Sequence, residues 1–199
     1  MSETLKKHSF KILLLLVVLI AGVFIFWTLQ TSEPDFPMKK EAASFEFTNL
    51  DGSAVSLENT QGKVRLVYFY YSHCPDVCPP TTHMLSKVQE SLKQAEVFGE
   101  EAAILSITFD PERDTTERLR EFSQFFNPDY SGWYFLRGEE KYTRDVAYAY
   151  GISVMDMGEG VLAHQNIIFL IDRDGYIRKY YDGTTTDPEE IAKDVLSLI

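Results

Sequence analysis

Apolar residues along this chain recur in two patterns that predict strands and helices. Residues 64–70 and 103–109 are rich in β-branched and aromatic residues, which is typical of strands buried inside a sheet. Apolar residues at helical spacing predict helices from about 78 to 97, over 116–126 and over 139–150. Strands and helices therefore alternate through the middle of the chain.

The flanking segments extend this order. Residues 44–57 predict a small hairpin with an Asp-Gly turn, and residues 133–136 form a short apolar strand. Residues 166–171 and 176–181 predict a hairpin around Asp-Arg-Asp-Gly, and a last helix begins after Asp187. Alternating strands and helices followed by an antiparallel hairpin predict an α/β fold, with a mixed central sheet and helices on both faces.

The N-terminal region has a different pattern. Residues 12–29 are eighteen residues without a charge, which as a helix would span about 27 Å, close to the hydrocarbon thickness of a bilayer. Trp27 near the end suits the lipid–water boundary, and three lysines precede the segment. We therefore expect one transmembrane helix with a cytoplasmic N-terminus. The alternative is a cleaved signal peptide, whose apolar region is usually shorter.

These patterns divide the chain into four parts. Residues 1–11 are the expected cytoplasmic N-terminus, and residues 12–29 the transmembrane anchor of a single-pass cell-membrane protein. Residues 30–42 have prolines, mixed charges and no periodicity, which is typical of a linker. Residues 43–199 are the expected folded domain, on the outer side of the membrane.

Composition limits the possible partners. The chain has 199 residues, of which 45% are hydrophobic, enough for a sizeable core. Its formal net charge of −11 argues against a nucleic-acid partner, because nucleic-acid binding needs a basic face.

The two cysteines of the chain are Cys74 and Cys78, directly after the strand predicted at 64–70. If a helix begins near Cys78, the two sulfurs can converge, either to form a disulfide reversibly or to hold a soft metal. A purely structural disulfide is the alternative, but a loop this short constrains the unfolded chain very little. A cysteine pair between the first core strand and its helix is the thioredoxin arrangement, in which the helix N-terminus lowers a thiol pKa.

The histidines offer a third donor. His164 precedes the strand predicted at 166–171, where a thioredoxin-like fold would bring it to both sulfurs; otherwise it is an ordinary surface histidine. His8 lies on the far side of the membrane segment, His73 points away from its neighbour Cys74, and His83 is turned away from the cysteines on the helix. Two thiolates and an imidazole suit copper, whereas a structural zinc site usually has four protein ligands.

Three motifs in register resemble the Sco family (SenC-like proteins): HCPDVCP at 73–79, SITFDPERDT at 106–115 and HQNIIFLID, followed by DG, at 164–175. The similarity runs from about residue 45 to 199. The resemblance implies a membrane-anchored, thioredoxin-like domain that binds copper, as Cu(I) or Cu(II), and delivers it to the binuclear copper site of cytochrome c oxidase subunit II. Another copper chaperone or a thiol reductant would be a further partner.

The resemblance also implies roles for single residues. Cys74, Cys78 and His164 would be the copper ligands. Asp110 would support a ligand or act as a weak fourth oxygen ligand, unless it caps the helix that begins at residue 116. Ala163 stands where family members often have Asp, which removes a carboxylate that would orient the histidine.

We therefore expect a copper metallochaperone rather than an enzyme. The alternative is a thiol–disulfide reductase that keeps the cysteines of the oxidase subunit reduced, with Cys74 and Cys78 as the redox pair. Dedicated thioredoxin-like reductases have a CxxC motif, whereas this chain has CxxxC, and they have a proline where this chain has Gln165. Both differences favour copper binding. A third alternative is a peroxidase. Peroxiredoxins place Thr three residues before the reactive cysteine, where this chain has Tyr71, so this difference argues against peroxidase chemistry.

Overall fold

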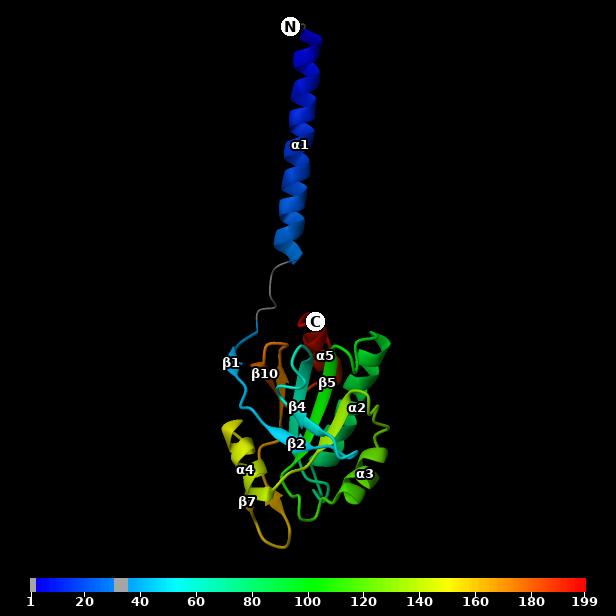
Figure 1. Ribbon diagram of the computed structural model, residues 1–199, viewed down its shortest axis with the longest axis vertical. Coiled ribbons are helices and arrows are strands. Elements are labelled where there is room, and N and C mark those ends of the chain that lie inside the picture. Colours follow the sequence, from blue (N-terminus) through cyan, green and yellow to red (C-terminus); the bar gives the residue numbers. More distant parts are fainter. Residues whose placement is uncertain (1–2, 31–35) are drawn as a thin grey trace. The chain divides into compact units, whose positions relative to one another are not determined.

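The computed structural model describes residues 3–30 and 36–199, with side chains described within 11–24 and 36–199. The chain divides into two units, Met1–Asp35 and Phe36–Ile199. The first unit holds one helix, α1 (Glu3–Gln30) (Figure 1). Within the described residues, none of the helices is both long and apolar enough to cross a membrane.

The membrane segment predicted at 12–29 lies partly outside that description, because the side chains of residues 25–30 are not described. The same holds for the linker predicted at 30–42, whose residues 31–35 are outside the described residues. Both assignments stay predictions.

The second unit carries the sheet and the remaining helices (Figure 1). Its elements in chain order are β1 (Lys40–Glu41), β2 (Glu46–Thr48), β3 (Ala54–Ser56), β4 (Val64–Tyr70), α2 (Cys78–Gln94), β5 (Ala102–Thr108), α3 (Thr116–Gln124), β6 (Trp133–Leu136), α4 (Glu140–Ala149), β7 (Met155–Asp156), β8 (Leu162–Ala163), β9 (Ile167–Ile171), β10 (Tyr176–Asp182) and α5 (Pro188–Ser197).

The central sheet has the strand order β1-β10-β9-β4-β5-β6. β4 and β5 are parallel, as are β5 and β6, whereas β9 runs antiparallel to β4 and to β10. All seven residues of β4 and of β5 are buried, as their β-branched and aromatic composition predicts for strands covered on both faces. The predicted mixed sheet is confirmed.

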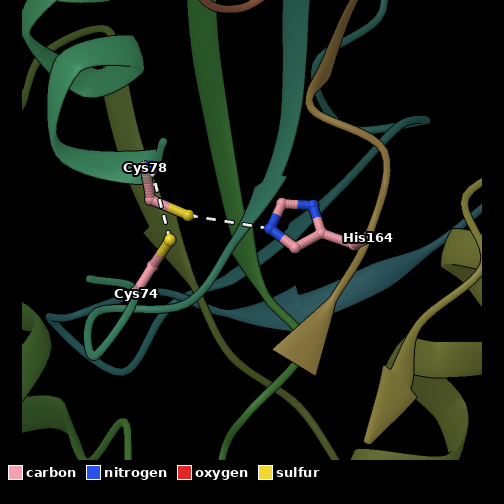
Figure 2. A group of neighbouring side chains, drawn as sticks. All are labelled: Cys74, Cys78 and His164. Atoms are coloured by element: carbon pink, nitrogen blue, oxygen red, sulfur yellow. Dashed lines mark hydrogen bonds between the residues drawn. The ribbon is translucent and has the colours of Figure 1, made fainter. Parts of the chain in front are cut away.

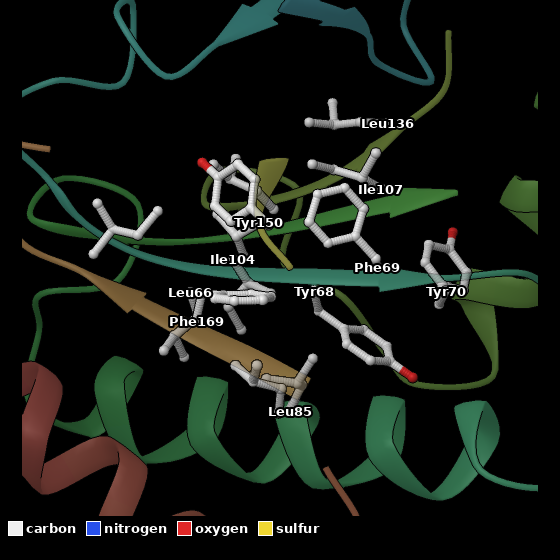
Figure 3. Close-up of a cluster of buried hydrophobic side chains, with 14 of the residues drawn as sticks. Leu66, Tyr68, Phe69, Tyr70, Leu85, Ile104, Ile107, Leu136, Tyr150 and Phe169 are labelled. Atoms are coloured by element: carbon white, nitrogen blue, oxygen red, sulfur yellow. The ribbon is translucent and has the colours of Figure 1, made fainter. Parts of the chain in front are cut away.

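Helices cover both faces of this sheet. The crossovers β4–α2–β5 and β5–α3–β6 move in one direction across the sheet, so right-handed connections put α2 and α3 on the same face. Figure 3 shows Tyr68 of β4 and Leu85 of α2 on that side, and Phe69 with Tyr150 on the other. Tyr150, at the end of α4, packs its ring 5.4 Å from that of Phe69. The expected helices on both faces are therefore confirmed.

Part of the predicted linker belongs to the sheet. Lys40 pairs with Ile177 and Glu41 with Tyr176 at the edge of β10. The second compact unit begins at Phe36, seven residues before the domain boundary predicted at residue 43. A two-residue edge strand has no periodicity of its own, because its partner strand supplies the pairing groups.

The topology places three loops at the same end of the sheet, where β4 and β5 finish and β9 starts. Because β4 and β5 are parallel, the segments that follow Tyr70 and Thr108 leave the sheet at the same end. The β7–β8 hairpin, in which Met155 pairs with Ala163, leads into β9, which is antiparallel to β4 and therefore starts at that end. The cysteine motif, the DPERD motif and His164 meet here.

Candidate metal centre

The cysteine loop ends where α2 begins. Val77 precedes the helix without a side-chain cap, and Cys78 is its first residue, with prolines following in the first turn. The first N–H groups of a helix lack partners inside the helix. Here the Cys78 N–H donates to Cys74 Sγ at 3.5 Å, so a sulfur takes the place of a capping side chain (Figure 2).

His164 approaches the sulfurs from the opposite side, at the end of β8 (Figure 2). Its Nε2 lies 3.8 Å from Cys78 Sγ, and its Nδ1 lies 3.0 Å from the carbonyl oxygen of Gln165. A carbonyl oxygen can only accept, so Nδ1 carries the proton and Nε2 presents a lone pair to the sulfurs. The donor atoms of Cys74, Cys78 and His164 all lie within 4.8 Å of one another. The three residues predicted as ligands are brought together.

An aromatic wall orients the imidazole. The His164 ring meets Phe109 edge-on at 4.8 Å between centroids and Tyr71 at 6.1 Å. The Tyr71 hydroxyl also accepts the Leu162 N–H at 3.3 Å, which ties the histidine hairpin to the residue just before the cysteine loop. This contact fixes the histidine segment without a carboxylate at position 163.

A second tie fixes the chain after His164. The Asn166 side-chain amide donates to the Thr81 hydroxyl of α2 at 2.9 Å, and the Asn166 carbonyl accepts the Gly183 N–H at 2.9 Å. Thr81 lies one turn after Cys78, so the histidine strand and the cysteine helix are held to each other directly.

The two sulfurs differ in protonation. A hydrogen bond from the Cys78 thiol, together with backbone N–H groups, lowers the pKa of Cys74 to about 3 against the effect of burial. The same hydrogen bond, followed by burial, raises the pKa of Cys78 far above its usual range. The reduced pair therefore holds one proton, on Cys78, and one negative charge, on Cys74.

Asp114, which the sequence motifs did not single out, holds the cysteine loop in place. Its fully buried carboxylate accepts the Ser72 N–H at 2.9 Å, the Ser72 hydroxyl at 2.5 Å and the Thr108 hydroxyl at 2.5 Å. His73 Nδ1 lies 3.2 Å from the same carboxylate. Arg118 adds a clamp from outside by donating to the hydroxyl and carbonyl of Ser72 at 3.0 and 3.1 Å. The signal in the sequence was the second aspartate of the DPERD motif.

Asp110 lies in a different group from the three candidate ligands. Its carboxylate accepts from Arg113 Nε at 2.5 Å, and burial raises its pKa. The structure groups it with His73 and Asp114, whose ligand atoms lie within 4.8 Å of one another. The alternative that Asp110 caps α3 is wrong, because Thr115 accepts the Arg118 N–H there at 3.2 Å. Its expected role beside the metal stays a prediction.

Neither His73 nor His83 belongs to the group of three donors. His83 is exposed on α2, and the side chain of His8 is outside the described residues. Two thiols and one imidazole are soft and intermediate donors, which favour copper over magnesium, calcium or manganese. A metal ion that binds here must displace the proton of the buried Cys78 thiol, whereas Cys74 is already a thiolate. The residues present therefore fit copper.

Comparisons with known proteins agree with this geometry. The family model described as SCO1/SenC matches residues 34–199. The SCO1 protein homolog of Bacillus subtilis is 30% identical over 168 residues, covering 81% of this chain and 84% of that protein. Two solved structures are similar: BsSco, from a report of a disulfide switch in this member of the Sco family of cytochrome c oxidase assembly proteins, and ScoI of Bradyrhizobium japonicum with copper bound.

The BsSco structure has a TM-score of 0.73 and 30% identity, and the match covers 84% of this chain and 98% of that one. The copper-bound ScoI structure has a TM-score of 0.67 and 29% identity, with 80% of this chain and 99% of that one covered. The predicted thioredoxin-like architecture of residues 43–199 is thus found in relatives over most of its length.

Proposed function

The chain belongs to the SCO1/SenC family, and we propose that it is a copper metallochaperone whose ligands are Cys74, Cys78 and His164. The observation that carries the proposal is the convergence of these three donors, all within 4.8 Å of one another, from segments far apart in the sequence. The copper-bound ScoI relative supports copper as the metal.

Binding needs little preparation of the site. Cys74 is already a thiolate, and the hydrogen bond from His164 Nδ1 to Gln165 leaves Nε2 free to bind. Cys78 must give up its proton, so copper uptake releases about one proton per site near neutral pH. The short distance between Cys78 Sγ and His164 Nε2, 3.8 Å, means that both donors reach one ion with a small movement.

Copper leaves by exchange of ligands. Cys74 is 8% exposed and His164 is half-buried, whereas Cys78 is fully buried. A thiol of the acceptor therefore approaches the copper from the side of Cys74 and His164, and Cys78 is the last ligand to let go. After release, the two cysteines return to a thiol and a thiolate, or close to a disulfide if an oxidant takes two electrons.

We further propose that the acceptor is cytochrome c oxidase subunit II and its binuclear copper site. The support is that BsSco is described as belonging to the oxidase assembly proteins. Residues 12–29 would anchor the chain in the cell membrane as a single pass with the domain outside, where another copper chaperone or a thiol reductant could also meet it.

The test is a copper titration of the reduced protein, followed by absorption and electron paramagnetic resonance. We expect one copper per chain and a sulfur-to-copper charge-transfer band that disappears when the thiols are oxidised. His164→Ala should lose Cu(II) binding and keep an oxidisable dithiol, whereas His83→Ala, at an exposed position of α2, should behave like the wild type. Unchanged copper affinity in His164→Ala would contradict the ligand assignment.

The second candidate is a thiol–disulfide reductase that acts on the oxidase subunit. It is favoured by the thiolate at Cys74, which could attack a disulfide, and by the disulfide switch reported for BsSco. Metal-free reduced protein that reduces a peptide disulfide at a rate unchanged by His164→Ala would favour this candidate. The CxxxC spacing and Gln165 favour copper instead.

A further inference from the structure

The hairpin that leads into His164 lies apart from the central sheet. Its strands, β7 and β8, pair with each other in a separate two-stranded sheet. The side chains of Met155, Met157 and Val161 are exposed, so burial of apolar surface does little to hold the hairpin in place. His164 follows β8 directly (Figure 2). The position of the hairpin therefore decides where the imidazole lies.

Arg113 of the DPERD motif contacts the tip of this hairpin, residues 157–161. Gly160 in the tip has a positive φ of 79°, which favours glycine. A Cβ at position 160 would overlap Nη1 of Arg113 and would lie 3.3 Å from its Cζ. The guanidinium thus lies directly against the backbone of the tip, in space that a glycine leaves open.

The same guanidinium has two further contacts. Its Cζ lies 5.8 Å from the centroid of the Tyr71 ring, a cation–π contact, and its Nε donates to the Asp110 carboxylate at 2.5 Å. Tyr71 in turn meets the His164 ring at 6.1 Å and accepts the Leu162 N–H. Arg113 therefore joins the hairpin tip to the DPERD motif and to the tyrosine that leads into the cysteine loop.

We propose that Arg113 is a positioning residue, which holds the hairpin tip against Tyr71 and so keeps His164 within reach of the two sulfurs. Asp110 acts through Arg113, by fixing the guanidinium, and not as a ligand of the metal. The planar guanidinium offers its face to the ring and its edge to the carboxylate, which a lysine ammonium does not. This inference rests on the proposed function.

The two oxidation states of copper should depend on Arg113 to different extents. Thiolates select Cu(I), so Cys74 and Cys78 can retain Cu(I) when the imidazole is poorly placed. Cu(II) prefers nitrogen donors more than Cu(I) does and depends on His164. A loosened hairpin should therefore weaken Cu(II) binding more than Cu(I) binding, whereas general damage to the fold would weaken both.

The first experiment needs no copper. Hydrogen exchange is followed by mass spectrometry in the full-length, reduced protein, over residues 155–163. Met157 N–H donates to the Val161 carbonyl at 2.9 Å, and Val161 N–H donates within the turn at 3.0 Å, so exchange of these amides reports opening of the hairpin. For Arg113→Ala we expect about tenfold faster exchange, from the combined loss of an ion pair and a cation–π contact. Unchanged exchange would overturn the proposal.

A matched control lies on α4. Arg144 pairs with Glu140 at 2.8 Å, and its side chain is 32% exposed, against 36% for Arg113. Arg144→Ala thus removes an arginine of similar exposure from a similar ion pair on another element. We expect its hairpin exchange and its copper affinities to stay within about twofold of the wild type. An equal effect of both variants on the hairpin would overturn the proposal.

The second experiment measures copper affinity by competition with chelators, for Cu(I) and Cu(II) separately. Arg113→Ala should bind Cu(II) about tenfold more weakly, as is typical when a residue that orients a ligand is lost. Its Cu(I) affinity should fall by no more than about threefold. Equal losses for the two states, or faster hairpin exchange with unchanged Cu(II) affinity, would overturn the positioning role. A wild-type protein that binds no copper would refute the proposed function, whereas the exchange experiment would still test the contact of Arg113 with the hairpin.

Two further variants test the partners of Arg113. Asp110→Ala should reproduce both effects of Arg113→Ala; weaker Cu(II) binding with unchanged hairpin exchange would show that Asp110 acts on the metal directly and would overturn its assignment here. Gly160→Ala should displace the guanidinium. Its effect on Cu(II) affinity should be smaller in the Arg113→Ala background than in the wild type, because the two residues are in contact. Equal effects in the two backgrounds would refute that contact.

Discussion

The carboxylate of Asp114 should contribute more to stability than other acidic residues of the domain. Asp114→Ala would leave three buried donors without their acceptor, namely the Ser72 N–H, the Ser72 hydroxyl and the Thr108 hydroxyl. Each unpaired buried donor costs about 1–3 kcal/mol. The two hydroxyls can rotate to other acceptors, so we expect a total loss near the lower end, about 3–5 kcal/mol.

The assay is urea unfolding of the metal-free, reduced protein, analysed by linear extrapolation. A loss of this size is a large part of the total stability of a typical domain, which is about 5–15 kcal/mol. The control is Asp145→Ala, at an exposed carboxylate that pairs with Lys141 on the surface of α4, and its unfolding midpoint should not change. A loss below about 1 kcal/mol in Asp114→Ala would refute the reasoning that this carboxylate holds the cysteine loop.

Three further predictions follow from the same contacts. Because the pKa of Cys74 is lowered to about 3, its thiolate persists from pH 8 to pH 5. The rate of Cys74 alkylation, followed by mass spectrometry, should therefore change by less than about twofold over this range, whereas the alkylation of an ordinary thiol slows about tenfold per pH unit. Gly183→Ala should cost about 1–3 kcal/mol in urea unfolding, because the new methyl group would come within 2.6 Å of the Asn166 amide; an unchanged midpoint would contradict the close approach. Thr115→Ala should cost about 1 kcal/mol by removing the acceptor of the Arg118 N–H, and no loss would show that α3 needs no cap there.

The elements whose boundaries the sequence predicted well are those that their own residues determine. β4 runs from Val64 to Tyr70 as expected, because a β-branched and aromatic run fits a strand with two covered faces. α2 starts at Cys78 as expected, because two prolines fit its first turn. Its end was predicted about three residues late, since α2 stops at Gln94 and Glu96 takes a positive φ of 60° that no residue type announced.

The parts that the sequence did not predict depend on partners far along the chain. β1 exists because β10, over a hundred residues later, offers it an edge. The hydrogen bonds of Asp114 join segments 42 residues apart in sequence, and the carboxylate pattern of a polar loop does not say which buried donors will reach it. The position of His164 could be predicted because it follows from topology, since a strand antiparallel to β4 must start where β4 ends.

The spacing of the two cysteines explains why the proposed site is asymmetric. With Cys78 as the first residue of α2, its own N–H points back to Cys74 Sγ, so the helix stabilises charge on the loop sulfur and not on the helix sulfur. The helix sulfur faces the core and His164 instead, and keeps the proton. The more accessible ligand is thus already charged, whereas the buried ligand is charged only after copper displaces its proton. An incoming copper ion would therefore meet Cys74 first and would complete the site at Cys78, and a departing ion would reverse that order.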